Sequence, residues 1–209
     1  HVHCIDAQKG TVLWKRPLDQ RYPVRVLECR ASPLIDGDLL ILFIARKSGA
    51  CVMALDKASG KEVWSTVDER ATNSSPVLIF AGGKKQLIVW TTDSVASLDP
   101  KTGKTLWQRP RKEVTSWNTP LVVEHKGRKQ VILNGTNRAR SYDLQTGQEI
   151  WNAPGTTVNA IPSPLTADGI AYIMAGYNGA TGYALPLDSK GEVTEKELLW
   201  RINKGTPYV

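Results

Sequence analysis

The sequence repeats one short pattern four times: Asp, three residues, Gly, three residues, then Trp. The four copies are Asp6-Gly10-Trp14, Asp56-Gly60-Trp64, Asp99-Gly103-Trp107 and Asp143-Gly147-Trp151. A pattern that returns at a nearly fixed interval indicates an array of similar supersecondary units. We therefore expect a row of equivalent units along the chain.

A second marker, Ser or Thr followed by Pro, fixes the length of the unit. It occurs at Ser32-Pro33, Ser75-Pro76, Thr119-Pro120, Ser163-Pro164 and Thr206-Pro207, so that successive prolines are 43, 44, 44 and 43 residues apart. Short apolar runs separated by Gly, Asp, Lys or Asn suggest four short strands in each unit. Units of about 40 to 50 residues with four strands each are typical of β-propeller blades.

Each Asp-x3-Gly segment is expected to form a hairpin connection. Asp can accept hydrogen bonds from its own turn, and Gly supplies the positive φ that such turns need. We expect the Trp to start the outer strand and to fill the gap between neighbouring sheets. The residue two positions before each Asp is small, which leaves room for the ring; these residues are Cys4, Ala54, Ser97 and Ser141.

The two markers predict an all-β chain in which residues 1–209 form a single β-propeller domain, present as a partial propeller of four full blades plus part of another. The predicted units are 1–31 (partial), 32–74, 75–118, 119–162, 163–205 and 206–209, the start of the next. The last full unit ends its pattern at Trp200 and carries an insertion around Pro186 to Glu197. Extra residues between Lys15 and Ala31 lengthen the first junction.

Composition narrows the classes of function. The formal net charge is +7, but the basic residues are spread along the chain, so we predict no nucleic-acid partner. The three cysteines, Cys4, Cys29 and Cys51, are too scattered for a disulfide framework or a zinc site, and we expect no metal centre. No apolar run approaches the roughly 18 residues of a spanning helix, so we predict no transmembrane segment.

The segments ALDKASGKEVW and SLDPKTGKTLW resemble the tryptophan-docking repeat of the PQQ-like β-propeller family. That family includes the quinoprotein dehydrogenases and BamB-like proteins of the bacterial envelope. The resemblance covers essentially the whole chain and implies antiparallel four-stranded blades. It also implies a periplasmic or cell-envelope location.

Two functions follow from this resemblance. The first is a non-catalytic scaffold that binds a protein partner or a small polar ligand at its loop face and packs against the remaining blades of the same propeller. The alternative is a fragment of a PQQ-dependent alcohol or glucose dehydrogenase, whose relatives use PQQ, calcium, a catalytic Asp and an adjacent Cys-Cys pair. The sequence has no Cys-Cys. We therefore predict no catalytic residue and no cofactor. PQQ and calcium are expected only if the chain is a dehydrogenase fragment.

Candidate binding residues precede the Ser/Thr-Pro markers, where the resemblance places the mouth of the central channel. They are Arg30, Asn73, Trp117, Asn118 and Asn159. Polar and aromatic side chains that converge at a concave mouth suit a small polar ligand or a peptide loop. The alternative is that the Asn residues only serve the turn into the inner strand.

The longer first junction is a second candidate surface. Its Arg and Tyr side chains are of the types that anchor protein interfaces, against the alternative of a solvated loop. These residues are Arg16, Arg21, Tyr22 and Arg25.

Overall fold

A computed structural model describes residues 1–18, 31–44, 50–114 and 116–208. These residues form β-strands and one 3-10 turn, η1 (Glu195–Glu197). The chain opens with a two-stranded hairpin of β1 (Val2–Ile5) and β2 (Val12–Arg16).

Four sheets follow in chain order, each containing an antiparallel run of four strands. The first contains β3 (Leu34–Asp36), β4 (Leu39–Phe43), β5 (Val52–Asp56) and β6 (Glu62–Thr66). The second contains β7 (Val77–Ala81), β8 (Lys84–Trp90), β9 (Ser94–Leu98) and β10 (Thr105–Pro110). The third contains β11 (Leu121–His125), β12 (Arg128–Leu133), β13 (Arg138–Asp143) and β14 (Glu149–Pro154). The fourth contains β15 (Leu165–Ala167), β16 (Ile170–Ala175), β17 (Thr181–Pro186) and β19 (Trp200–Ile202).

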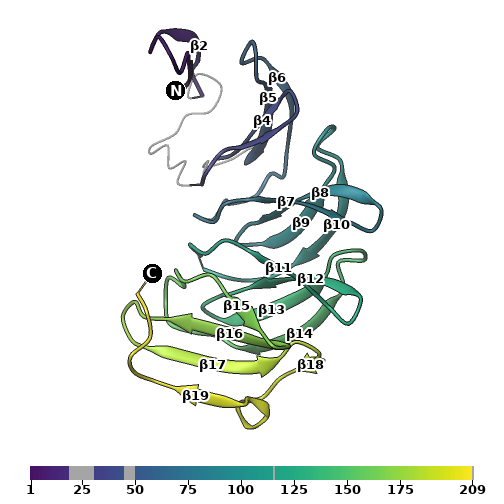
Figure 1. The fold of residues 1–209 in the computed structure, drawn as a ribbon, viewed down its shortest axis with the longest axis vertical. Coiled ribbons are helices and arrows are strands. Elements are labelled where there is room, and N and C mark those ends of the chain that lie inside the picture. The colour runs from purple at the N-terminus through teal and green to yellow at the C-terminus, as the bar shows by residue number, and fades with distance from the viewer. Residues whose placement is uncertain (19–30, 45–49, 115, 209) are drawn as a thin grey trace.

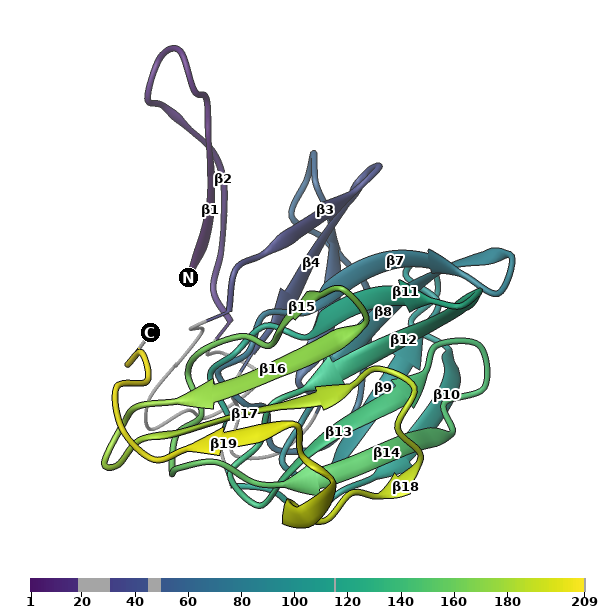
Figure 2. The same cartoon turned by 60° about the horizontal axis from the view of Figure 1, so that its bottom comes forward.

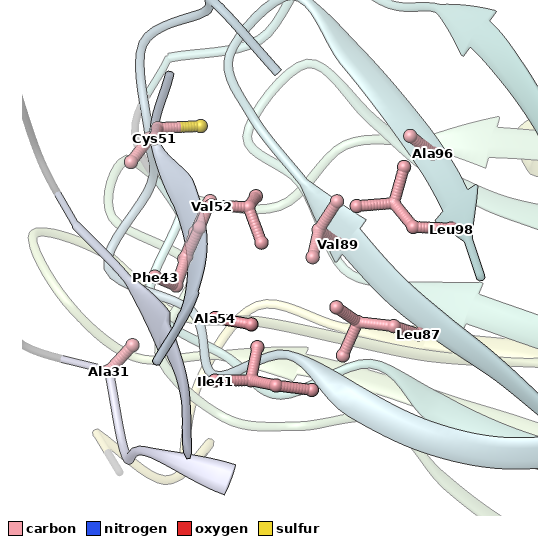
Figure 3. Packing of buried hydrophobic residues seen from close by; sticks show 11 residues of the cluster. Ala31, Ile41, Phe43, Cys51, Val52, Ala54, Leu87, Val89, Ala96 and Leu98 are labelled. Carbon is pink, nitrogen blue, oxygen red and sulfur yellow. The ribbon is translucent and has the colours of Figure 1, made fainter. Parts of the chain in front are cut away.

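The sheets pack face to face in the order of the sequence, as Figures 1 and 2 show. Figure 3 shows the apolar contact between the first two sheets, where Ile41, Val52 and Ala54 face Leu87 and Val89. Similar buried clusters join the second sheet to the third and the third to the fourth. This arrangement confirms the prediction of an all-β partial propeller with antiparallel four-stranded blades.

A β-bulge precedes the repeated Trp in each of the first four outer strands. In the third sheet, for example, Ser141 pairs with Trp151 while Tyr142 pairs with Glu149, so Ile150 is the extra residue. The small residues two before each Asp lie opposite the rings, in the pairs Cys4 with Trp14, Ala54 with Trp64, Ser97 with Trp107 and Ser141 with Trp151. These four outer strands begin two residues before the Trp and not at it, because the bulge residue and the residue before it already belong to the strand. Only β19 (Trp200–Ile202), among the described outer strands, begins at its Trp.

In three successive interfaces the Trp ring lies against the Gly of the next unit's turn. A Cβ on that Gly would stand 2.6 Å from the nearest ring carbon, so only glycine fits. The pairs are Trp14 with Gly60, Trp64 with Gly103 and Trp107 with Gly147. Each indole N–H also donates to the carbonyl of the residue after the next Asp, at 3.0 Å to Lys57, 3.2 Å to Pro100 and 3.2 Å to Leu144.

The insertion of the last unit contacts the neighbouring third sheet through a strand and not through a glycine turn. Its strand β18 (Gly191–Glu192) leaves the fourth sheet and joins the outer edge of β14 in parallel, so the third sheet has five strands. Leu187 and Val193, which flank it, are buried in the cluster between the third and fourth sheets. Trp151 is fully buried there, and no glycine among the described residues is found against its ring.

Candidate functional site

The segments that link the outer strand of one sheet to the inner strand of the next lie at one end of the sheets. We call the connectors 67–76, 111–120 and 155–164, with the loop 134–137, the rim. The Asn73 N–H donates to the Ser116 carbonyl at 2.9 Å, and the Trp117 N–H donates to the Ala160 carbonyl at 3.1 Å. The three connectors therefore lie side by side, and their residues before the Ser/Thr-Pro markers are brought together.

The Ser/Thr-Pro marker itself joins neighbouring units. The Ser32 N–H donates to Oγ of Ser75 at 3.0 Å, and the Thr119 N–H donates to Oγ of Ser163 at 3.1 Å. In these pairs a hydroxyl of one unit accepts from the backbone of the unit before it. This contact gives a structural reason for the hydroxyl residues Ser75 and Ser163 before their inner strands.

Buried amides hold the rim in place. Nδ2 of Asn118 donates to the carbonyls of Asn134 at 2.8 Å and Ala160 at 2.9 Å. Nδ2 of Asn134 in turn donates to the carbonyls of Pro162 at 3.1 Å and Met174 at 2.8 Å. The amide groups of both Asn side chains thus connect backbones that lie far apart in the sequence.

A buried carboxylate fixes the connector 111–120 to the loop of the next sheet. Glu113 accepts the N–H groups of Asn137 at 2.9 Å and Arg138 at 3.0 Å, and it pairs with Nη1 of Arg140 at 2.7 Å. Its side chain has no exposed surface. Such a charge is tolerated only when it is paired and hydrogen-bonded. Glu113 was not predictable from the sequence, because a single acidic residue in a connector carries no signal of burial.

Arg111 lies near the ion pair of Glu113 and Arg140, but it contacts an aromatic ring. Its guanidinium stacks over the ring of Trp90, with Cζ 4.3 Å from the centroid. Burial lowers the pKa of Arg111 to about 10, and Nε and Nη2 find no acceptor in the described part of the chain. Burial also raises the pKa of Tyr142 to about 12 on the facing sheet.

The structure places four of the five residues predicted for the channel mouth. Asn73, Trp117 and Asn159 are half-buried on the three adjacent connectors, and Asn159 has a positive φ of 54°. Asn118 is buried, with its amide nitrogen engaged as described above. Arg30 lies outside the described residues.

The second predicted surface is described only at Arg16. Nη1 of Arg16 donates to the Gly60 carbonyl at 3.1 Å, and Nη2 pairs with Glu62 at 3.0 Å. Arg109 follows Trp107 by two residues, as Arg16 follows Trp14, and its Nε donates to the Gly147 carbonyl at 3.0 Å. Both arginines thus hold the turn of the next sheet. Arg21, Tyr22 and Arg25 lie outside the described residues.

A pocket of about 320 Å³ lies at the opposite end of the sheets, where the hairpin of β7 and β8 meets that of β11 and β12. Its walls include Phe80, Glu124, Arg128, Lys129 and Asp143. Lys129 donates to the Phe80 carbonyl at 3.0 Å across the interface. No sequence pattern joins these residues, because they come from two hairpins and a distant turn.

The described ranges hold neither a metal cluster nor a membrane-spanning helix. Within them, no three His, Cys, Asp or Glu side chains come close enough to hold a metal ion. The same residues include no helix that is long and apolar enough to cross a membrane.

Known proteins share both the repeat and the fold. The family model described as outer membrane protein assembly factor BamB matches residues 1–173. No curated protein matches significantly. The solved structure of BamB from Moraxella catarrhalis is similar over 95% of this chain and 56% of that chain, with 19% identity and a TM-score of 0.64.

Two other solved structures share the fold. The computationally designed Ika8 protein is 16% identical over 81% of this chain and 48% of that chain, with a TM-score of 0.51. The quinohemoprotein alcohol dehydrogenase ADHIIG from Pseudomonas putida HK5 is 16% identical over 82% of this chain and 33% of that chain, with a TM-score of 0.50. The chain thus spans little more than half of the BamB structure, and these likenesses show the fold alone. On the family match and the repeat geometry together, the chain belongs to the PQQ-like repeat family of the outer membrane protein assembly factor BamB.

Proposed function

We propose that the chain is part of a non-catalytic PQQ-like propeller that binds a protein partner through its rim in the bacterial cell envelope. The observation that carries the proposal is the alignment of the three connectors, which gathers half-buried Asn73, Trp117 and Asn159 on one backbone-fixed surface. Trp is a preferred anchor of protein interfaces. The family match to an outer membrane assembly factor supports the envelope location and a protein as the ligand.

The rim is suited to binding because its backbone is fixed before any ligand arrives. Glu113 and Asn118 hold the connector on either side of Trp117. A surface that is already ordered loses less conformational entropy on binding. The half-buried rim residues combine the amides of Asn73 and Asn159 with the indole of Trp117, so the proposed surface offers both polar and aromatic contacts.

The proposal is tested by photo-crosslinking in cells with the intact protein. A benzophenone amino acid replaces Trp117 in one variant and Phe80 in the other. Phe80 is the matched control, because it is an aromatic residue, 61% exposed, at the opposite end of the sheets. A discrete envelope protein crosslinked at position 117 but not at position 80 is expected. Equal crosslinking at both positions, or none at position 117, contradicts the proposal.

The quinoprotein alternative is tested separately. The intact protein is titrated with PQQ in the presence of calcium by calorimetry and then assayed for dye-linked oxidation of an alcohol and of glucose. Our proposal expects no saturable heat and no turnover. Micromolar binding together with turnover would replace the scaffold by an oxidoreductase.

We further propose that the outer face of the fourth sheet packs against another blade of the same propeller. Leu165 is 64% exposed, Ile202 is 41% exposed and Trp200 is 38% exposed on this sheet. The three earlier Trp rings that lie on glycine turns support this packing. Acrylamide quenching of tryptophan fluorescence is measured for the intact protein and for its Trp200→Phe variant. The difference between the two isolates Trp200, and we expect this indole to be protected from the quencher. Quenching typical of an exposed Trp contradicts this packing.

A further inference from the structure

The outer edge of the third sheet is already occupied by an added strand. β18 lies alongside β14, as Figure 2 shows, with Trp151 opposite Gly191 and Asn152 opposite Glu192. The Val193 N–H donates to the Asn152 carbonyl at 2.8 Å. This contact shows that an outer edge of this propeller accepts a short parallel strand.

The bulge residue of β14 is buried in the same sheet to which β18 adds. Ile150, the bulge residue of β14, is only 9% exposed, and Val193 is 3% exposed. Both belong to one buried cluster with Trp151. Burial of the bulge residue accompanies the strand contact at this edge.

The outer strand of the first sheet, β6, has the same β-bulge before its Trp as β14, but no strand is added to it in the described residues. In the described residues, β6 is the last strand of its sheet. Its bulge residue, Val63, is 51% exposed, and Trp64 is only partly buried. Ser65 stands where Asn152 stands in β14, two residues after the bulge. An apolar side chain and a strand edge are therefore open together.

β6 and β14 also share a side-chain hydrogen bond to a Glu of the same strand. Oγ of Ser65 donates to Glu62 at 2.9 Å, as Nδ2 of Asn152 donates to Glu149 at 2.9 Å. On both strands, the side chain of the second residue after the bulge thus donates to a Glu three residues earlier.

The intervening edge, β10, differs at this point. The Gln108 carbonyl, which is equivalent to the accepting carbonyl of Asn152, already accepts Nη1 of Arg109 at 3.2 Å. An added strand would have to displace that bond. β6 is therefore the better edge.

We propose that the outer edge of β6 is a docking site for an extended protein segment, which adds in parallel as β18 does on β14. The segment carries a glycine opposite Trp64 and a β-branched apolar residue two positions later, as Gly191 and Val193 do beside β14. Gly191 has a φ of 66°, so a glycine at this position allows the turn onto the edge. Backbone bonds along an open edge supply the affinity, and the apolar side chain supplies the selectivity. This site is separate from the rim and does not depend on the rim's function.

The test uses the intact protein and a synthetic peptide with the sequence of residues 188–196, blocked at both ends. Binding is followed by fluorescence anisotropy of a label on the peptide, and its position by the amide NMR shifts of Ser65 and Thr66. We expect saturable binding with shifts at these two amides. The peptide with Val193→Asp should bind at least tenfold more weakly.

Protein variants locate the contact. Val63→Asp should weaken binding at least tenfold, and Val63→Ile, which adds apolar surface, should strengthen it. Phe80→Asp is the control, because Phe80 is an exposed apolar side chain on β7 of the second sheet, and this change should leave the affinity unchanged. Unchanged affinity in both Val63 variants would overturn the proposal, since the peptide would then have displaced β18 from β14 or bound elsewhere. Absence of binding at millimolar peptide would also overturn it.

Discussion

The glycine turns offer a sharp test of how neighbouring sheets pack. Gly147 and Gly10 occupy the same position in two copies of the repeat, with φ values of 71° and 68°. A Cβ on Gly147 would lie 2.6 Å from two carbons of the Trp107 ring, whereas a Cβ on Gly10 would meet nothing within 4 Å. Alanine therefore brings the same backbone strain to both positions but a collision to only one.

The expected losses in the free energy of unfolding follow from these distances. A left-handed backbone costs an alanine about 1–2 kcal/mol relative to glycine. Overpacking of a well-filled contact adds about 1–3 kcal/mol. Trp107 cannot retreat without cost, because it is 8% exposed and donates to the Leu144 carbonyl. Gly147→Ala should thus destabilise the protein by about 2–5 kcal/mol, and Gly10→Ala by about 1–2 kcal/mol.

Denaturant unfolding of the intact protein, followed by tryptophan fluorescence and circular dichroism, measures this difference. A second variant combines Gly147→Ala with Trp107→Leu, which removes the ring that the new methyl group meets. The collision term should then largely disappear, so the two changes should be strongly non-additive. Equal losses for Gly10→Ala and Gly147→Ala, or additive effects in the double variant, would refute the packing argument.

Three further predictions concern the buried groups. Arg140→Met should cost about 2–4 kcal/mol in thermal or chemical unfolding, because it leaves the carboxylate of Glu113 buried without its cation. Arg111→Met should be neutral or stabilising in the same assay, since this guanidinium is buried with unpaired N–H groups; a loss as large as that of Arg140→Met would contradict this. The raised pKa of Tyr142 favours the neutral phenol in the folded state, so its contribution is complete below pH 10 and is lost as the pH rises toward about 12. Tyr142→Phe should reduce this alkaline loss by about 2–3 kcal/mol, and an unchanged dependence of stability on pH would argue against it.

Local chemistry made the repeat units predictable. The Asp, Gly and small residues of each unit act within one hairpin, so their spacing reports the turn directly. Oδ1 of Asp99, for example, accepts the N–H groups of Lys101 at 2.9 Å and Thr102 at 3.0 Å inside a single turn. The all-β class, the four strands in each unit and the place of Trp between sheets follow from such short-range patterns.

The candidate site was predictable only in part. The Ser/Thr-Pro spacing indicated that Asn73 and Trp117, each three residues before its Pro, occupy equivalent places in successive units. Asn159 lies five residues before its Pro, so the same spacing does not align it with them. The spacing could not show that Asn118 is buried with its amide nitrogen bonded to two carbonyls. It could not show either that Arg16 binds the turn of the next sheet. Both contacts join residues more than 15 positions apart.

The sequence by itself determined the period, the turns and the succession of blades, because these depend on interactions within a few residues of each marker. Only the tertiary structure decided where the insertion goes and which charges are buried. β18 pairs with a strand about 40 residues earlier, and Glu113 meets its partners in the next sheet. Neither contact leaves a periodic signal, since each occurs once, at a place where two distant segments are brought together by the packing of whole sheets.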